Sequence, residues 1–295
     1  MLPSISIIIP FIEDNALLRL AIESCLQVDY PRELLELILV YNGGLQLEFP
    51  LELYSKTGSI RLIREDKKGP YSARNAGAKI AKGEMLLFTD SDCVVDKNWA
   101  IRLVSPFKDN KISAVFGKVL AYNPVTALES FGNKYIFNHG RMQLVFPWGG
   151  NSALRKKVFE ELGGFDEDFI SGGDMDFGIR LRKQNFYMRY EPEAIVYHKH
   201  REALKGIFKQ YKKYGSGWLL LREKWGKEIK IYPNWRRVLV SAIYLFFTIF
   251  NLVPYIIERR TVGNKGKRFK YLYLAVMNFG LAAGYCQKKN KGYIN

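Results

Sequence analysis

Short apolar runs alternate with helix-spaced stretches over residues 1–90 of the chain. Ile5–Ile9 is a β-branched run stopped by Pro10, and such a run is typical of a strand that is buried on both faces. Leu37–Val40 indicates a second strand, and Ile60–Ile63 a third, short one. Between the first two runs, residues 14–27 place apolar side chains at helical spacing. The pattern therefore predicts strand, helix, strand and a third strand in succession.

A fourth apolar run, Met85–Phe88, follows a predicted helix over residues 71–81 and ends at acidic residues. Strands that alternate with helices predict right-handed βαβ units and a mostly parallel sheet flanked by helices, which is an α/β fold. In such sheets ligands bind at the carboxyl ends of the strands. Pro10, Asn42 and Asp92 all fall at such ends, so we expect a binding site there.

The pattern is less regular in the rest of the chain, and the softest domain boundary falls within residues 200–235. The elements expected before that boundary are a strand over residues 115–122, a loop over 148–151, a helix over 155–162, a helix over 174–183 and a strand over 194–197 that ends at His198.

Two acidic pairs carry the candidate chemistry. Asp90 and Asp92 follow the fourth strand, and Asp174 and Asp176 follow a glycine turn. Because Mg²⁺ and Mn²⁺ prefer carboxylate oxygens, the first pair can hold a divalent cation and, through it, a diphosphate. If this pair stood alone, a solvated turn at the end of a strand would explain it better. Asp174 can serve as a general base, although aspartate is also a preferred residue at a helix start.

Two further side chains are suited to the same ligand. Arg74 lies in a basic turn that contains Gly69 and opens a helix, where backbone N–H groups and a guanidinium favour a diphosphate. A solvated basic turn is the alternative. His198 ends a predicted strand, so its imidazole can complete the coordination of a metal, or can serve the structure alone.

Trp148 and Asp176 are candidates for contact with a sugar or an acceptor. Trp148 precedes two glycines and can stack on a sugar ring, but a buried tryptophan beside a turn is equally ordinary. Asp176 and Arg180 are four residues apart on the predicted helix and can simply pair with each other.

Charge is distributed very unevenly along the 295 residues. The net charge is +16, and residues 201–295 hold 20 Lys and Arg against 4 Asp and Glu, whereas residues 1–200 hold 25 of each. Such asymmetry favours an anionic partner. Because residues 238–257 form an uncharged apolar stretch, we expect an anionic membrane surface and not a nucleic acid.

Two apolar stretches, 238–257 and 271–286, flank a basic segment. A hairpin across the bilayer would place that segment outside, against the positive-inside preference. We therefore expect two helices that lie in or dip into the cytoplasmic leaflet. The alternative is a helix pair packed on the catalytic domain or on a second copy, which would make a homo-oligomer.

The cysteines and the N-terminus favour the cytoplasm for residues 1–200. Cys25, Cys93 and Cys286 are an odd, scattered set without metal-ligand spacing, which argues for a reducing compartment. The apolar run Ile5–Ile9 is too short for a signal peptide.

Taken in order, the motifs between Ser4 and Trp218 resemble glycosyltransferase family 2, the inverting enzymes of the GT-A fold. The resemblance is carried by Ile7–Pro10, Ala73–Gly77, Gly83–Asp92, Asn151–Arg155, Gly163–Glu167 and Gly173–Asp176. A processive member would carry a Gln-x-x-Arg-Trp motif, which Gln210–Tyr214 does not match. The resemblance implies the transfer of a single sugar from a nucleotide-diphosphate donor, UDP- or GDP-linked, to a hydroxyl acceptor that is lipid-linked or a surface glycan precursor.

The resemblance also implies roles for particular residues. Donor contacts are expected from Pro10 and Asn42 at the nucleobase, from Asp90 at the ribose or diphosphate, and from Gly150 and Asn151.

For the chemistry, the resemblance implies that Asp92 and His198 hold Mg²⁺ or Mn²⁺ and that Asp174 is the catalytic base. Two positions depart from the family pattern. Tyr41 and Asn42 replace the acidic residue that usually follows the second strand, and Gly173 replaces the glutamate that usually precedes the base.

These expectations place a GT-A catalytic domain at residues 1–215 and a basic, apolar helical region at 216–295, on the cytoplasmic face of the membrane. Loops over 122–148 and 200–235 are expected to shape the acceptor site. Two alternatives remain open at this point: a catalytically degenerate membrane-bound partner of another transferase, and a nucleotidyltransferase.

Overall fold

The computed structural model describes residues 1–44, 59–126, 129, 149–226, 242–243, 245–246, 248–250, 253 and 265–285. They form two compact units. The first unit comprises the described residues of 1–122, 137–168 and 173–199, and the second those of 123–136, 169–172 and 200–295.

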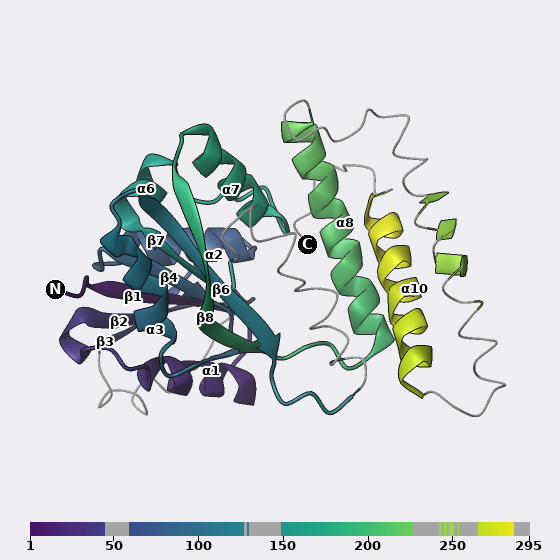
Figure 1. The fold of residues 1–295 in the computed structure, drawn as a ribbon, viewed down its shortest axis with the longest axis horizontal. Helices are drawn as coiled ribbons and strands as arrows, with labels where there is room; N and C mark the ends of the chain where they lie inside the picture. Colours follow the sequence, from purple (N-terminus) through teal and green to yellow (C-terminus); the bar gives the residue numbers. More distant parts are fainter. Residues whose placement is uncertain are drawn as a thin grey trace. The chain divides into compact units, whose positions relative to one another are not determined.

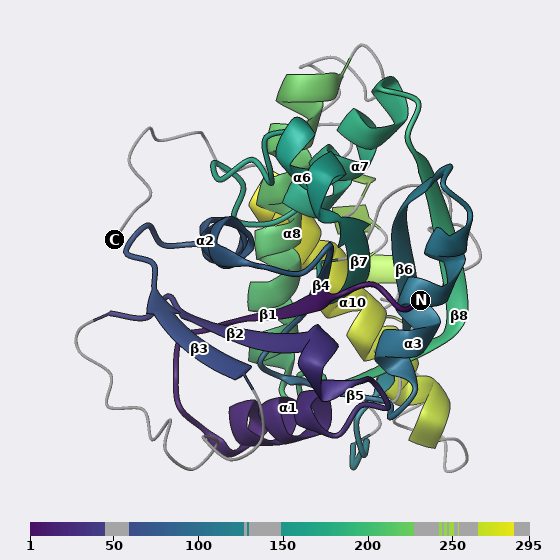
Figure 2. The same cartoon turned by 90° about the vertical axis from the view of Figure 1, so that its left-hand side faces the viewer.

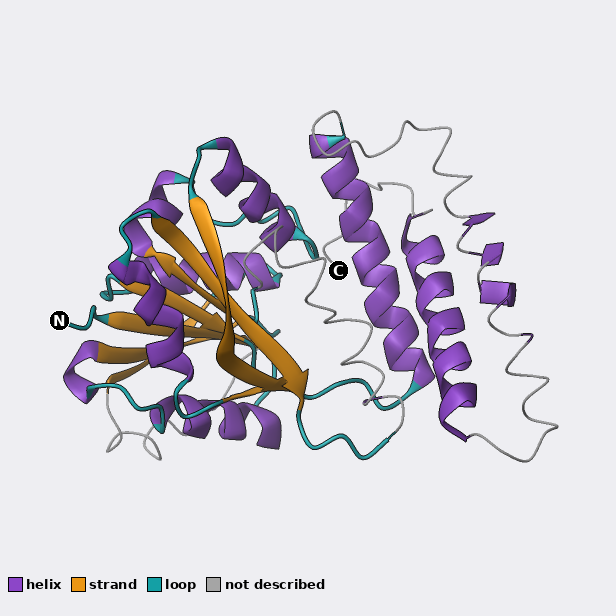
Figure 3. Ribbon diagram, in the orientation of Figure 1, coloured by secondary structure: helices purple, strands orange, loops and turns teal. Residues whose placement is uncertain are grey.

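The first unit is built on one eight-stranded sheet flanked by helices, as Figures 1 and 3 show. The strand order is β3-β2-β1-β4-β7-β6-β8-β5. The strands are β1 (Ile5–Phe11), β2 (Leu35–Tyr41), β3 (Ser59–Arg64), β4 (Met85–Thr89), β5 (Cys93–Val95), β6 (Ile112–Ala121), β7 (Asn151–Arg155) and β8 (Tyr187–His198). The helices are α1 (Ala16–Leu26), η1 (Arg32–Leu34), α2 (Pro70–Ile80), α3 (Trp99–Val104), η3 (Ser105–Lys108), α6 (Lys156–Glu161) and α7 (Gly173–Lys183).

The first four strands and the helices between them lie where the sequence pattern predicts them. β3, β2, β1 and β4 run parallel to one another. The rest of the sheet is mixed, because β7 is antiparallel to both β4 and β6, and β5 is antiparallel to β8. The sheet is therefore parallel in the half that the sequence pattern describes best.

Asn151 is not part of a loop, as the sequence suggested, but opens strand β7. Only Ala153 and Leu154 of this strand are apolar aliphatic residues, so its pattern does not mark it as a strand. Its burial comes from its place between β4 and β6. β5 and α3 were also missed, because each is a short element without a period of its own.

Helices α1 and α2 cover opposite faces of the parallel half of the sheet (Figure 2). Successive side chains of a strand point to opposite faces. Ile7 accordingly packs with Leu18 and Ile22 of α1, whereas Ile8 faces Gly77 of α2. A Cβ at Gly77 would lie 2.6 Å from Cγ2 of Ile8, so glycine allows α2 to lie this close to the sheet. This close contact holds α2, which carries Tyr71 and Arg74 of the site described below, against the sheet.

The second unit contains two helices that lie side by side, α8 (Leu204–Trp225) and α10 (Lys265–Tyr285), as Figure 1 shows. The hydroxyl groups of Tyr211 and Tyr273 lie 3.3 Å apart in their interface. A Cβ at Gly284 would collide with the carbonyl oxygen of Lys212, so the backbones cross closely. The sequence-based expectation of a loop over residues 200–235 is thus wrong for α8, whose mixed polar and apolar composition concealed a helix.

The predicted helix over 271–286 corresponds to α10 up to its end at Tyr285, and Cys286 lies outside the described residues. Most of the predicted helix 238–257, and of the loop 122–148, also lies outside them. Among the described helices, none combines the length and the apolar composition that a membrane crossing requires.

Candidate active site

The first acidic pair lies in the turn between β4 and β5. Thr89, the last residue of β4, is fully buried, and Asp90 and Asp92 follow it with partial exposure. The backbone N–H of Cys93 donates to the carbonyl of Asp90 at 3.1 Å, which closes the turn. The buried strand thus delivers both carboxylates to the carboxyl end of the sheet.

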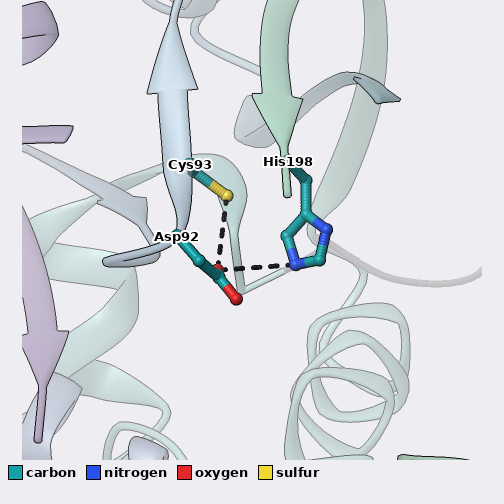
Figure 4. Close-up of side chains that lie close together, drawn as sticks. All are labelled: Asp92, Cys93 and His198. Carbon is teal, nitrogen blue, oxygen red and sulfur yellow. Dashed lines mark hydrogen bonds and ion pairs between the residues drawn. The ribbon is translucent and has the colours of Figure 1, made fainter. Parts of the chain in front are cut away.

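Asp92 and His198 are brought together by the pairing of β5 with β8, as Figure 4 shows. Nε2 of His198 lies 3.4 Å from Oδ1 of Asp92. The thiol of Cys93 contacts the same oxygen at 4.0 Å, and all three ligand atoms lie within 4.8 Å of one another. Burial, and then the charges of Asp92 and Asp90, raise the pKa of Cys93 well above its usual value, so this thiol stays protonated.

The donor chemistry of this cluster suits a divalent cation. A carboxylate oxygen and an imidazole nitrogen are ligands that first-row divalent ions accept, whereas a protonated thiol is a poor ligand for a hard ion. Asp92 and His198 therefore fit the implied Mg²⁺ or Mn²⁺, and their role as ligands stays a prediction. Sequence reasoning did not single out Cys93, although it directly follows Asp92. The pairing of β5 with β8 is what brings His198 beside both residues.

Arg74 of α2 is buried and forms an ion pair with Asp90. Its guanidinium also lies against the backbone of Gly149, where a Cβ would be 3.0 Å from Cζ. A Cβ at Gly150 would similarly be 2.6 Å from Oδ2 of Asp90. The two glycines let the ion pair lie directly on the backbone, which gives Gly150 a steric role beside its predicted donor contact.

Asp174, the candidate base, is the second residue of α7 and is only 7% exposed. Its Oδ1 accepts hydrogen bonds from the backbone N–H of Met175 at 3.0 Å and from the hydroxyl of Tyr71 at 3.3 Å. Its Oδ2 accepts a longer one, 3.5 Å, from the N–H of Gly149. Burial raises the pKa of this carboxyl, while Arg74 and the N–H groups oppose the shift. A raised pKa makes a carboxylate a stronger base near neutral pH.

Asn42 is committed to the loop that precedes α2. Its amide nitrogen donates to the carbonyls of Glu65 at 2.7 Å and Lys67 at 2.8 Å, and its oxygen accepts from the N–H of Gly69 at 2.8 Å. Pro10 is half-buried within β1, opposite Val40. The nucleobase contacts predicted for Pro10 and Asn42 stay predictions. The hydrogen bonds of the Asn42 amide hold the loop before α2 in its conformation.

Asn151 is likewise committed to the fold. Its amide oxygen accepts from the indole N–H of Trp99 at 2.8 Å, and its nitrogen donates to the carbonyls of Lys118 and Ala194 at 2.8 and 3.0 Å. It is completely buried. The donor contact predicted for Asn151 stays a prediction. Its side chain links α3, β6 and β8 through these hydrogen bonds.

Asp176 is completely buried and pairs with Arg180 at 2.8 Å. Arg180 also donates to the carbonyls of Leu162 and Gly164, at 2.6 and 2.8 Å. The i, i+4 pairing is therefore the interpretation that the geometry supports, and the pair holds the glycine turn after α6. Trp148 lies outside the described residues.

Tyr71 is the site residue that sequence reasoning missed. It lies one helical turn before Arg74, so both side chains leave the same face of α2. The sequence contained one indication of this role: a tyrosine and an arginine stand three residues apart just after a glycine-proline turn.

Comparisons with known proteins show which family the chain belongs to. Residues 6–163 match Glycosyl transferase family 2, and residues 85–285 match Glycosyl transferase family group 2. The probable glycosyltransferase YdaM of Bacillus subtilis is 25% identical over 84% of this chain, which covers 63% of YdaM.

A second relative covers nearly the whole chain. It is the dolichyl N-acetyl-alpha-D-glucosaminyl phosphate 3-beta-D-2,3-diacetamido-2,3-dideoxy-beta-D-glucuronosyltransferase of Methanococcus voltae, 25% identical over 93% of this chain and 92% of its own. Among solved structures, the mannosyltransferase PcManGT from Pyrobaculum calidifontis, in complex with GDP-Man and Mn²⁺, matches with a TM-score of 0.64. The match covers 96% of this chain and 86% of PcManGT at 15% identity.

The structural match defines the class: the chain has the GT-A fold, as the sequence predicted. The match to Glycosyl transferase family 2 covers more than half of this chain, and it therefore defines the family. This chain belongs to Glycosyl transferase family 2.

Replacing Asp176 by alanine should destabilise the fold. It leaves the Arg180 guanidinium without its charge partner, and breaking a buried ion pair costs about 3–5 kcal/mol. Urea unfolding of Asp176→Ala measures the loss. Asp66→Ala is the matched control, because its pair with Arg64 is exposed and such pairs contribute about 0–1 kcal/mol. Equal losses in the two variants would contradict this account of Asp176.

Proposed function

We propose that this protein is a metal-dependent, inverting glycosyltransferase that moves one sugar from a nucleotide-diphosphate donor to a hydroxyl group of its acceptor. One observation carries the proposal. Helix α2 contacts both acidic motifs, through Arg74 at Asp90 and through Tyr71 at Asp174. A donor-side carboxylate and a buried base are thereby held by the same rigid element.

Asp174 supplies the base in this reaction. Its carboxylate takes the proton of the acceptor hydroxyl while the acceptor oxygen forms a bond to the anomeric carbon. The bond from that carbon to the diphosphate oxygen breaks, and its electron pair leaves with the nucleoside diphosphate. Because attack and departure occur on opposite faces of the sugar, the configuration inverts.

The donor side is assigned to the other motif. Asp92 and His198 would hold Mg²⁺ or Mn²⁺, which neutralises charge on the leaving diphosphate when it is bound. Asp90, which is paired with Arg74, is proposed to contact the ribose or the diphosphate. The similar solved structures were determined with GDP-Man and Mn²⁺ in PcManGT and with UDP and Mn²⁺ in GalNAc-T7, so GDP and UDP are both nucleotides to test.

The acceptor is proposed to be a lipid-linked saccharide or a surface glycan precursor. The relative from Methanococcus voltae is named for a dolichyl phosphate-linked acceptor, and it matches this chain over nearly its whole length. A lipid-linked acceptor is consistent with the basic and apolar composition of residues 201–295.

The second unit is proposed to lie on the cytoplasmic face of an anionic membrane. Apolar side chains are exposed on the described residues between 242 and 253, among them Phe246 and Phe250, which are 63% and 62% exposed. The surrounding segment carries the basic excess, and basic residues beside an apolar helix face are attracted to anionic headgroups.

Replacing Asp92 by asparagine should abolish the metal dependence of nucleotide binding. In calorimetric titrations with UDP and GDP, the wild-type protein should bind one nucleotide more tightly with Mn²⁺. Because changes around a metal site already cost about 10–100-fold in affinity, the loss of a ligand should cost at least about tenfold. Asp109→Asn, in an exposed turn before β6, is the control. Wild-type protein that binds neither nucleotide under any condition would refute the donor site.

Replacing Asp174 by asparagine should reduce release of the nucleoside diphosphate from the sugar nucleotide by about 10²–10⁴-fold, with nucleotide affinity unchanged. The pKa of Asp174 is raised, so the wild-type rate should rise with pH, with its midpoint above the ordinary aspartate value of about 3.9. Below that midpoint the base is protonated and inactive. Full activity in Asp174→Asn would exclude it as the base.

Membrane association can be measured by flotation with lipid vesicles. The protein should float with vesicles containing phosphatidylglycerol and much less with pure phosphatidylcholine, and added salt should weaken binding because it screens surface charge. Phe246→Ser with Phe250→Ser should reduce flotation. If the protein stays in solution with anionic vesicles at low salt, the membrane proposal is wrong.

A further inference from the structure

The hydroxyl of Tyr71 reaches Asp174 across the gap between α2 and α7. It donates to Oδ1 at 3.3 Å, although 103 residues separate the two along the chain. Tyr71 itself is held firmly. Its ring packs against Phe165 at 5.4 Å, and the Arg74 guanidinium lies over it at 5.6 Å. Tyr71 is 5% exposed, so packing sets the position of its hydroxyl.

Gly173 provides the space for this tyrosine. A Cβ at this position would lie 2.8 Å from Cε2 of Tyr71 and 2.9 Å from Cδ2 and Cζ. The left-handed backbone belongs to Gly172, whose φ is +85°, so backbone strain does not require a glycine at 173. Because the Tyr71 ring fills this space, the residue before Asp174 has no room for a side chain. This explains why Gly173 stands where the family pattern has a glutamate.

Tyr71 keeps its phenol proton near neutral pH and so can donate a hydrogen bond. Burial, reinforced by the charge of Asp174, raises the pKa of this phenol well above its ordinary value. A neutral phenol beside a carboxylate donates its proton into the hydrogen bond, which favours the charged form of the acid.

We propose that Tyr71 is the positioning residue of Asp174, fixing Oδ1 so that Oδ2 is the oxygen that takes the proton of the acceptor. The proposal rests on the assignment of Asp174 as the base. The groups that face this carboxylate are the Arg74 cation and the Tyr71 phenol from α2, and the backbone N–H groups of Gly149 and Met175. Arg74 is already paired with Asp90, so it does not substitute for the phenol.

Tyr71→Phe tests the proposal, because it keeps the ring and removes only the hydroxyl. Nucleotide affinity with Mn²⁺ should be unchanged, while kcat should fall about tenfold or more, as expected for the loss of a hydrogen bond to a charged group. The midpoint of the acidic limb of the kcat profile should move to higher pH, since the charged form of Asp174 has lost a donor. An unchanged kcat and an unchanged midpoint would overturn the proposal.

Tyr30→Phe is the matched control. It removes another buried phenol, whose hydroxyl donates to the carbonyl of Pro3 at 2.5 Å. This variant should lower the melting temperature and leave the pH profile of kcat in place. A shift of the profile in Tyr30→Phe equal to that in Tyr71→Phe would show a general effect of destabilisation and overturn the positioning role.

A double-mutant cycle with Gly173 tests the steric part. Gly173→Ala forces a Cβ into the Tyr71 ring and should reduce kcat, whereas the same change in a Tyr71→Ala background should have little further effect. Equal reductions of kcat in both backgrounds would show that the Tyr71 ring is not the reason why residue 173 is a glycine.

The pKa of Asp174 should also be measured without any reaction, by ¹³C NMR of its carboxyl carbon, with Asp174→Asn providing the assignment. A rise of this pKa in Tyr71→Phe supports the contact even if the wild-type protein transfers no sugar, in which case the proposed function fails alone. Transfer by the wild-type protein, with the same pKa in both proteins, overturns the role of Tyr71 alone.

Discussion

A buried cation sets the arrangement of the candidate site. The guanidinium of Arg74 is almost inaccessible, and a buried charge is costly unless it is paired and hydrogen-bonded. Asp90 supplies the pairing, and the field of Asp174 adds to it. Glycines at 149 and 150 let the backbone of the neighbouring turn approach the pair. The need to neutralise one arginine thus brings both acidic motifs to helix α2, which itself is seated on the sheet through Gly77.

Asparagine amides hold the segments around this cation. Each of three asparagines uses its side chain to complete hydrogen bonds that main-chain groups or an indole lack, so the loops are shaped before any ligand arrives. They are Asn42 at the loop before α2, Asn75 at Phe165, and Asn151 among α3, β6 and β8. Loops that are already ordered favour ligand binding, because ordering them on binding would cost affinity.

Residues that resemble a family motif therefore divide into two kinds here. Asp92, His198 and Asp174 present carboxylate and imidazole groups at the site, whereas the side chains of Asn151 and Asp176 make contacts that hold the fold together. The same motif thus contains both groups suited to chemistry and groups that hold the scaffold. Family membership alone does not separate them, since a conserved pattern is expected from either kind.

The sequence alone determined the parallel half of the sheet, because Ile5–Ile9, Leu37–Val40 and Met85–Phe88 are apolar runs that only a buried strand accommodates. The sequence also identified the family, because the motifs follow one another along the chain in the order that the family shows. Only the tertiary structure decided the mixed half of the sheet. β7 has no periodicity and is buried solely because β4 and β6 flank it.

The contacts of Tyr71 with Asp174 and of His198 with Asp92 were likewise decided in three dimensions. Each joins elements that are distant along the chain or depends on a strand pairing, and spacing in sequence carries no information about such pairs. Local patterns predict elements, but the distances between elements arise from packing, and at this site packing places the groups that the chemistry needs.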